Sequence, residues 1–595
     1  MPRFDSPSVF GAILDRTAGH FRFAPKGIMA PLSRRYEPGT LVLETTWSTD
    51  DGWLVIRDSL TIAEWSNSGD GDEHEGISHE ADLSLVRVAE CIEGEVDLEM
   101  ICAPRFGYGA DAAIWIEGEF GEATAEGDKC GTRLSLATDL NFEVGTGDAV
   151  GSIHLKEGEK AFCSLAWGEG IDSHPRSAPE SAERIDTTKE YWREWLVQGS
   201  FPDHPWRAYL QRSALVLKGL IYEPTGAILA APTTSLPETP GGERNWDYRF
   251  SWIRDSTFAL WSLHSLGFDA EARAFMKFVR DRVEESEDGD LQIMYGIGGE
   301  HDLTESTLDH LSGYEGAKPV RIGNGAFDQH QYDVWGALLD AVYVHRLALA
   351  EHATAADMEL IRQLAQAAIE AWPIPDQGIW EARGEPRHYV SSKLMIWVAV
   401  DRAARMAHQY GNKDQADEWD QIAAGFKEEI IEKGARDGVF RQHYDTDALD
   451  ASVLLMPLVR FLPPDDERIV ATVQAVREGL DDQGLILRYI TGETDDGLQG
   501  KEGTFLICSF WMVSALSEIG EIDEARKLCE RLVTAAEPLE LFAEEIEASS
   551  NRHLGNFPQA FTHLALINAV SHVIKDEQHE RTPGQRTAVF SEMRD

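Results

Sequence analysis

The chain up to about residue 175 alternates apolar and polar residues in short runs separated by Gly and Asp. Residues 41–47 and 53–58 form two such runs around Asp50-Asp51-Gly52, and an Asp-Gly pair between apolar runs is typical of a β-hairpin. The polar, Gly-rich segment 67–80 is predicted to be a mobile loop. The alternation recurs in three further runs, at residues 84–91, 96–100 and 113–117. Many short strands joined by turns predict an antiparallel β-sandwich.

The hydrophobic period then changes to that of an α-helix. Residues 179–198 carry Tyr191, Trp192 and Trp195 on one predicted face, which indicates a helix that connects two domains. Beyond about residue 203, nearly every ordered stretch has the helical period. Twelve helices are predicted there, at about residues 204–220, 253–266, 270–286, 330–351, 356–371, 390–410, 414–433, 449–460, 465–479, 503–518, 522–536 and 557–574.

A weak internal repeat joins three pairs of these helices. Residues 266–272, 410–416 and 519–525 each place a Gly after one helix and an Asp before the next. A Gly in the left-handed position that ends a helix, followed by an Asp N-cap, predicts a tight helical hairpin. The long connections then lie at the opposite end of the domain, at residues 224–250, 288–328, 373–389, 481–502 and 537–556. Helical hairpins that close on themselves predict an (α/α)6 toroid with its functional residues on the long loops.

These patterns predict a multidomain β + α protein, in which an N-terminal antiparallel β-sandwich is followed by an (α/α)6 toroid. A chain of 595 residues is long enough for more than one hydrophobic core. The predicted boundaries are 1–178 for the sandwich, 179–202 for the linker helix, 203–576 for the toroid and 577–595 for a flexible tail.

The chain is strongly acidic, because 103 Asp and Glu against 54 Lys and Arg give a formal net charge of −49. The acidic residues are spread along the whole chain, so nucleic acids and anionic membranes are poor partners. Such a surface favours a protein that stays soluble at high salt, although an ordinary acidic enzyme fits nearly as well. The sequence contains no apolar run long enough for a membrane span and begins without a signal-peptide pattern. The six Cys form no CxxC pair and no zinc-ligand spacing, so we expect a cytoplasmic protein with reduced thiols and no metal.

The long loops hold an unusual concentration of aromatic and charged residues. The clearest example is residues 242–256, which read Gly-Glu-Arg-Asn-Trp-Asp-Tyr-Arg-Phe-Ser-Trp-Ile-Arg-Asp-Ser. Flat aromatic rings can stack on the apolar faces of a pyranose, and Arg, Asp and Asn can hydrogen-bond its hydroxyls. A buried Arg–Asp network that holds the start of a helix would explain the same residues without a ligand.

One loop glutamate, Glu381, directly follows Trp380. The indole could desolvate the carboxyl group and raise its pKa, as a general acid requires. Arg383 and Arg387 would act in the opposite direction. An exposed loop glutamate without a role is the alternative interpretation.

Two adjacent glutamates, Glu544 and Glu545, follow an apolar stretch in the last long loop. Such carboxylates could hold a water for attack on a substrate. In so acidic a chain, solvated surface residues are the alternative interpretation.

Residues 245–256 resemble the signature of glycoside hydrolase family 15, which comprises glucoamylases, glucodextranases and microbial trehalases. Further stretches resemble the same family in chain order: 319–326 with Gln329, Gln331 and Asp333, then 378–381, 502–511 and 554–561. Residues 2–10 resemble the sandwich domain of the prokaryotic and trehalase-like branches. The resemblance therefore extends over both predicted domains.

The resemblance implies an (α/α)6 barrel, an inverting mechanism and a pocket closed at one end, which restricts cleavage to terminal glucose. By this likeness Glu381 is the general acid and Glu544 the general base, with Glu545 as the alternative base. The carboxyl groups of an inverting enzyme lie about 6.5–9.5 Å apart, so that a water fits between them. Arg254 and Asp255 are implied to grip the terminal glucose. The other implied substrate-binding residues are Trp246, Trp380, Arg488, Glu502 and Gln559, and no metal or cofactor is implied.

Within the family, residues 292–296 and 313–315 are most similar to trehalase-type members, which implies α,α-trehalose as the substrate. Activity of the glucoamylase or glucodextranase type on α-glucan ends is the alternative. Two other classes stay open: an α-glucoside phosphorylase, which would not use Glu544 as a base, and a non-catalytic sugar-binding protein. Members with this sandwich usually have about two dozen more residues before Pro2-Arg3-Phe4-Asp5, so we expect either a misplaced start codon or an incomplete sheet with an exposed edge.

Overall fold

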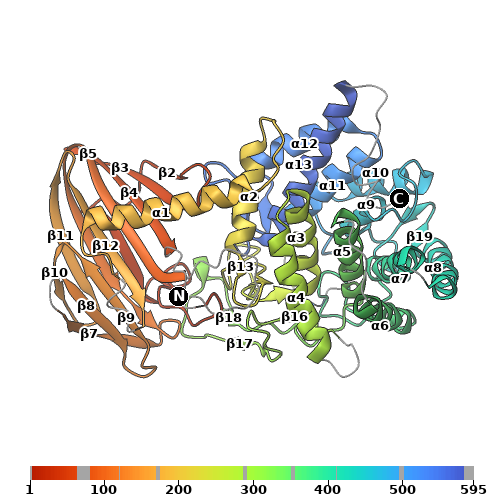
Figure 1. The fold of residues 1–595 in the computed structure, drawn as a ribbon, viewed down its shortest axis with the longest axis horizontal. Coiled ribbons are helices and arrows are strands. Elements are labelled where there is room, and N and C mark those ends of the chain that lie inside the picture. The colour runs from red at the N-terminus through yellow and green to blue at the C-terminus, as the bar shows by residue number, and fades with distance from the viewer. Residues whose placement is uncertain are drawn as a thin grey trace. The chain divides into compact units, whose positions relative to one another are not determined.

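The computed structural model describes residues 3–62, 81–118, 121–168, 174–285, 291–349, 355–410, 412–494, 497 and 502–581. The chain forms two compact units, Met1–Gly199 with Leu308–Gly316, and Ser200–Thr307 with Ala317–Asp595. The first unit is built mainly of strands and the second mainly of helices (Figure 1). The loop predicted at 67–80 lies outside the described residues.

The first unit is an antiparallel sheet that branches at one long strand. Its strands are β1 (His20–Pro25), β2 (Ser33–Tyr36), β3 (Leu43–Ser48), β4 (Gly52–Ile62), β5 (Ala81–Ala103), β6 (Arg105–Phe106), β7 (Asp111–Glu117), β8 (Glu122–Gly127), β9 (Arg133–Thr138), β10 (Asn141–Val144), β11 (Ala149–Lys156) and β12 (Lys160–Trp167). Neighbours follow the order β2-β3-β4-β5-β12-β9-β8-β7-β6, while β1 and β11 pair with β5, and β10 pairs with β11. The predicted Asp-Gly hairpin is present, with Trp47 of β3 opposite Leu54 of β4.

The long strand β5 corrects the prediction of two separate strands at 84–91 and 96–100, because both lie in one strand of 23 residues. Gly94 has a positive φ of 71° and pairs with Gly52, and a Cβ on Gly94 would lie 2.1 Å from the carbonyl oxygen of Asp51. Glycine thus bends the strand without breaking it. The first part of β5 pairs with β4 and β12, and the last part pairs with β1 and β11. The core between these layers includes Phe23, Leu54, Met100, Leu136, Leu155 and Leu165, as expected for a β-sandwich.

The predicted linker helix is α1 (Ala178–Val197), and it packs on the sheet of the first unit. Its buried residues include Ala178 and Ile185, which join Val86 and Phe162 of the sheet in one apolar cluster. The buried face therefore differs from the aromatic face that the sequence predicted. Of those three aromatic residues only Trp195 is buried.

The second unit contains the twelve predicted helices in the predicted order, within the residues that the structure describes. They are α2 (Arg207–Gly219), α3 (Ile253–Ser265), α4 (Asp269–Glu285), α5 (Val334–Leu349), α6 (Ala355–Ala371), α7 (Val390–Tyr410), α8 (Lys413–Gly434), α9 (Leu455–Leu458), α10 (Glu467–Gly479), α11 (Leu506–Glu518), α12 (Ile522–Thr534) and α13 (Ala560–Arg581). The helix predicted at 449–460 is shorter than expected, because a 3-10 turn at Ala451–Leu454 precedes a single α-helical turn. The last helix continues beyond the predicted end of the toroid at residue 576.

Alternate helices form a closed inner ring. Each inner helix contacts the next in the order α3, α5, α7, the 3-10 turn with α9, α11 and α13. The ring closes because α13 contacts α3. The residues of α11 from Leu506 to Leu516 are all buried, as expected for an inner helix, whereas α12 is strongly amphipathic, as expected for an outer one. The expected (α/α)6 arrangement is thereby confirmed.

Two of the three tight turns between paired helices use the predicted glycine, and two of the predicted caps are not caps. Gly267 and Gly520 have positive φ, whereas Gly411 lies outside the described residues. Asp414 and Asp523, predicted as N-caps, lie inside the first turns of α8 and α12. The cap of α8 is Asn412, whose side chain accepts a hydrogen bond from the backbone N–H of Gln415.

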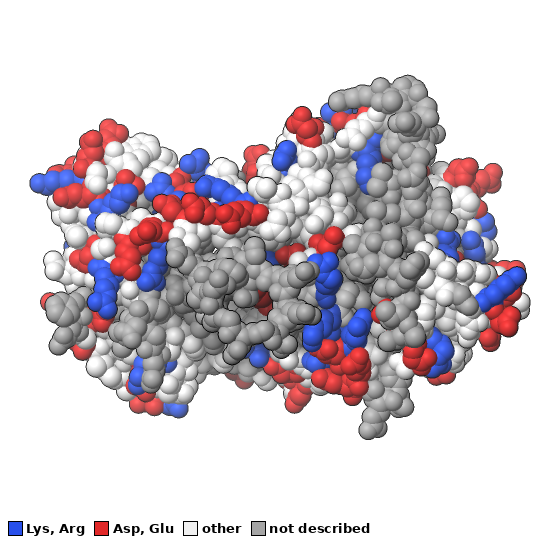
Figure 2. Space-filling view, in the orientation of Figure 1, with Lys and Arg blue, Asp and Glu red and all other residues white. Residues whose placement is uncertain are grey.

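The surface carries charges of both signs. On the face shown in Figure 2, acidic and basic side chains are interspersed over the described residues and do not gather into one basic patch. None of the described helices is both long and apolar enough to cross a membrane.

Candidate active site

The five long loops of the helical unit and the helix starts beside them surround one cavity. Its empty volume is about 720 Å³, open solvent at its mouth included. The cavity is lined by Ala230, Glu238, Trp246, Tyr248, Trp252, Arg254, Asp255, Asn324, Ala326, Ile379, Trp380, Glu381, Arg383, Arg488, Phe505, Glu544, Gln559 and Phe561. The structure therefore brings Glu381 and Glu544, which are distant in sequence, into one cavity.

Glu381 stands on a strained turn at the cavity wall. Its φ is 58°, in the left-handed region that residues other than Gly seldom adopt. The indole Nε1 of Trp252 donates a hydrogen bond of 2.6 Å to Oε1 of Glu381. Burial raises the pKa of Glu381, while Arg254 and the Trp252 hydrogen bond act in the lowering direction. The rise expected from a neighbouring Trp is present, but the indole that contacts the carboxyl group belongs to Trp252.

Glu544 directly precedes β24 (Glu545–Glu547). The hydroxyl of Tyr248 donates a hydrogen bond of 2.6 Å to Oε1 of Glu544, and the side-chain amide of Gln559 donates one of 3.3 Å to the same oxygen. The other oxygen, Oε2, is buried without a hydrogen-bond partner among the described residues. Burial raises the pKa of Glu544, and the charge of Glu238 raises it further.

Glu545 is fully buried and does not line the cavity. Its Oε2 accepts a hydrogen bond of 2.7 Å from the backbone N–H of Gly503. Adjacent residues at the start of a strand point to opposite faces, so only one of this pair can face the cavity. That residue is Glu544.

Arg254 and Asp255 lie in the first turn of α3 and are both buried. Nε of Arg254 donates to Oδ1 of Asp255 at 2.7 Å. Its Nη1 donates to the side chain of Gln331 and to the backbone oxygen of Ile379, both at 3.0 Å. These bonds fix the guanidinium at the cavity wall, and Nη2 lies 4.0 Å from Oε1 of Glu381.

Arg488 lines the cavity, whereas Glu502 does not. Two parallel hydrogen bonds of 2.6 Å join the guanidinium of Arg488 to Glu502, and Arg244 contacts the same carboxylate at 2.5 Å. Glu502 is thus an anchor for two arginines behind the wall, which differs from the substrate contact that the resemblance implied. Trp380 does line the cavity, with its Nε1 donating to Oδ1 of Asp450 at 2.9 Å.

A buried cluster of charges lies beside Glu544. Trp246 lines the cavity and donates from Nε1 to Oε1 of Glu238 at 2.7 Å. Burial raises the pKa of Glu238 to about 7. The cluster holds the carboxyl groups of Glu238, Glu502, Glu544 and Glu545 and the guanidiniums of Arg244 and Arg488. Burial in this cluster raises the pKa of Glu238, Glu544 and Glu545, and the neighbouring carboxylates act in the same direction.

Several lining residues were missed by sequence reasoning. Tyr248 and Trp252 lie within the quoted signature, so their aromatic character was the available signal. Glu238 lies outside every stretch that resembles the family, and only its hydrogen bond with Trp246 shows that it belongs to the site. Phe505 and Phe561 lie in quoted stretches but read as core residues of the following helices.

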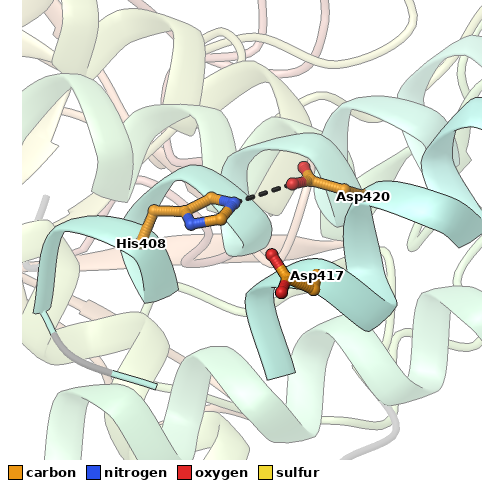
Figure 3. Close-up of side chains that lie close together, drawn as sticks. All are labelled: His408, Asp417 and Asp420. Carbon is orange, nitrogen blue, oxygen red and sulfur yellow. Dashed lines mark hydrogen bonds and ion pairs between the residues drawn. The ribbon is translucent and has the colours of Figure 1, made fainter. Parts of the chain in front are cut away.

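Away from the cavity, His408, Asp417 and Asp420 lie close together at exposed positions (Figure 3). Nε2 of His408 and Oδ2 of Asp420 are 2.7 Å apart. A surface hydrogen bond between His408 and Asp420 accounts for this contact, and we assign no metal to the group.

Comparisons with known proteins match both units. The family model "Glycosyl hydrolases family 15" matches residues 205–571, and the model "Trehalase-like, N-terminal" matches residues 1–192. The chain is 52% identical to a protein named trehalase from Mycolicibacterium smegmatis, over 98% of this chain and 89% of the relative. A protein named trehalase from Thermoplasma volcanium is 33% identical over 95% of this chain and 88% of the relative.

A solved structure of a bacterial glucoamylase complexed with acarbose superposes with a TM-score of 0.72. It covers 98% of this chain and 92% of the glucoamylase chain at 12% sequence identity, and so shows the fold alone. The family match extends over more than half of the chain and includes every residue that lines the cavity. The chain therefore belongs to glycosyl hydrolase family 15 and is a glycoside hydrolase.

Proposed function

We propose that this enzyme is an inverting, exo-acting trehalase, in which Glu381 is the general acid and Glu544 the general base. The observation that carries the proposal is the presence of these two carboxyl groups in one cavity, beside the Arg254–Asp255 pair. Two relatives that are named trehalase support the choice of α,α-trehalose. They are 52% and 33% identical to this chain over nearly its whole length.

In the proposed reaction, Glu381 gives its proton to the oxygen that joins the two glucose units. The raised pKa of this half-buried carboxyl group favours the protonated form that a general acid needs. Glu544 takes a proton from a water on the opposite face of the ring, and that water attacks the anomeric carbon. Tyr248 and Gln559 both donate to Oε1 of Glu544 and so fix the position of the carboxyl group for this step.

The transition state resembles an oxocarbenium ion, and the remaining groups of the cavity hold the glucose unit that carries this charge. Arg254 and Asp255 are fixed to each other and offer donors and acceptors to hydroxyl groups at the buried end. Trp380 and Arg488 complete this end of the cavity. A separation of about 6.5–9.5 Å between the two carboxyl groups is the expectation for inversion.

The cysteines support a reducing compartment. All six are unpaired and five of them are buried. We place the enzyme in the cytoplasm on this basis.

The purified chain, assayed for glucose release from trehalose, maltose, maltotriose and isomaltose with and without phosphate, tests this function. We expect hydrolysis of trehalose that does not depend on phosphate. In the first turnovers, NMR should find β-glucose from the attacked unit and α-glucose from the leaving unit in equal amounts. Release of glucose from maltotriose without activity on trehalose would assign the enzyme to α-glucan ends instead, and phosphate-dependent turnover would assign it to the phosphorylases.

A further inference from the structure

Arg383 lies two residues after the proposed acid and is the exposed member of the cavity lining. By contrast, Arg254 and Asp255 are only 6% and 9% exposed. The exposure of Glu381 lies between that of this pair and that of Arg383. A general acid must stand beside the bond that it cleaves, with the attacked sugar on one side and the leaving group on the other. Arg383 therefore lies on the side of the leaving group.

The side chain of Arg383 rests on Trp246. Its Cζ is 4.5 Å from the centroid of the Trp246 ring, and Cζ of Arg321 is 4.6 Å from the same ring. Glu238 fixes the edge of the indole through the 2.7 Å hydrogen bond from Nε1. Cation–π contacts of this kind stabilise the position of a guanidinium without using its N–H groups.

Glu305 joins the two arginines. Its Oε1 is 3.2 Å from Nε of Arg321, and its Oε2 is 3.2 Å from Nη2 of Arg383. Arg321 also donates to the backbone oxygens of Glu243 and Asn245, at 2.8 and 2.9 Å. These bonds hold Arg321 against the loop that carries Trp246. Among the described residues, the contacts of Arg383 are the carboxylate of Glu305 and the Trp246 ring. A guanidinium has five N–H donors, so Arg383 keeps donors that can serve a ligand in the cavity.

We propose that Arg383, positioned by Trp246 and Glu305, binds hydroxyl groups of the leaving sugar and makes the enzyme selective for a polyhydroxylated leaving group. This inference rests on the proposed hydrolase function of the same cavity. The planar fork of the guanidinium suits two neighbouring hydroxyls, which a single ammonium group cannot match. A leaving group without hydroxyls gains nothing from Arg383.

The test compares trehalose with α-D-glucosyl fluoride, whose leaving group is a single fluoride ion. The variants are R383A and R383K, and R477A is the matched control. Arg477 is paired with Glu524 on the outer surface at a similar exposure, 35% against 33% for the Arg383 side chain. We expect R383A to lower the ratio of kcat/KM for trehalose to kcat/KM for the fluoride by about 10- to 100-fold. R477A should leave this ratio unchanged.

The fluoride reaction also reports whether R383A is folded. A parallel loss on both substrates, or no loss on either, would overturn the proposal. Full recovery of trehalose activity in R383K would also overturn it, because charge alone would then account for the effect of Arg383.

An indirect effect through Glu381 is distinguishable by pH. The charge of Arg383 acts to lower the pKa of Glu381, so R383A should move the alkaline limb of the profile to higher pH. A loss of trehalose activity that persists at the pH optimum supports sugar binding. A loss confined to a displaced limb contradicts it.

Failure of the proposed function has a different signature. If the wild-type enzyme cleaves maltose and not trehalose, the trehalase assignment fails, and the same ratio is then measured with maltose.

Discussion

The rings of Tyr248 and Trp252 lie edge to face with their centroids 5.4 Å apart, and each ring donates a hydrogen bond to a different carboxyl group of the cavity. The hydroxyl of Tyr248 donates to Oε1 of Glu544 and the indole Nε1 of Trp252 donates to Oε1 of Glu381, both at 2.6 Å. The two residues lie only four positions apart in one loop and at the start of α3. One short segment thus sets the position of both proposed catalytic groups.

Replacement of the proposed acid should depend on the leaving group. We expect E381Q to lower kcat/KM for trehalose by about 10²- to 10⁴-fold, because Gln cannot protonate the departing oxygen. Hydrolysis of α-D-glucosyl fluoride should fall far less, since fluoride leaves without a proton from Glu381. Steady-state kinetics on both substrates measure the difference, with E385Q, at an exposed glutamate of the same loop, as the control. Equal losses on the two substrates would remove Glu381 from the role of acid.

The two adjacent glutamates should differ sharply. E544Q is expected to lose about 10²- to 10⁴-fold in kcat on both trehalose and the fluoride, because neither reaction proceeds without an activated water. E545Q should lose much less, because Glu545 does not line the cavity and Gln can still accept the hydrogen bond from Gly503. Turnover is measured with and without phosphate. The opposite order of losses would make Glu545 the base.

Glu238 should influence the acidic limb of the pH profile through its effect on the pKa of Glu544. The base works when ionised, so the pKa of Glu544 governs this limb. The charge of Glu238 acts to raise that pKa and Arg488 and Tyr248 act to lower it. In E238Q the raising charge is gone, while an acceptor for Trp246 remains. The pKa of Glu544 then falls, and the acidic limb of kcat/KM should move to lower pH.

The shape of the profile, rather than its height, is the measurement for E238Q, because Glu238 also lines the cavity. E223Q is the control, because Glu223 is exposed and, like Glu238, lies between α2 and α3. An acidic limb that stays in place or moves to higher pH would contradict the proposed coupling.

Two helical glycines should respond to alanine in opposite directions. In α5, a Cβ on Gly336 would lie 2.0 Å from the carbonyl oxygen of Met395 in α7, so the inner ring would have to shift. In α8, a Cβ on Gly425 meets nothing within 4 Å. We expect G336A to destabilise the enzyme by about 1–3 kcal/mol. G425A should stabilise it by about 0.5–1 kcal/mol, because Ala is the better helix former. Thermal unfolding measures both, and a lowered midpoint for G425A or an unchanged one for G336A would contradict the surroundings described for these two glycines.

The sequence by itself determined the two kinds of unit and their order. Hydrophobic period is a local property, so the change from strand to helix near residue 178 is readable from neighbouring residues alone. The same is true of the turn glycines Gly267 and Gly520 and of the long loops that carry the charged and aromatic residues. The adjacent Trp380 and Glu381 drew attention to one carboxyl group of the cavity without any coordinates.

Tertiary structure decided every relationship that depends on how the ring of helices closes. The choice between Glu544 and Glu545 follows from which one faces the cavity, and the anchoring of Arg488 by Glu502 joins side chains whose contact no local pattern encodes. Likewise, Gly94 could have ended a strand, but its pairing with Gly52 made it a bend within β5. The physical reason is the same in each case: desolvation and charge act over a few ångströms in space, and closure of the ring sets those distances between residues that the sequence keeps far apart.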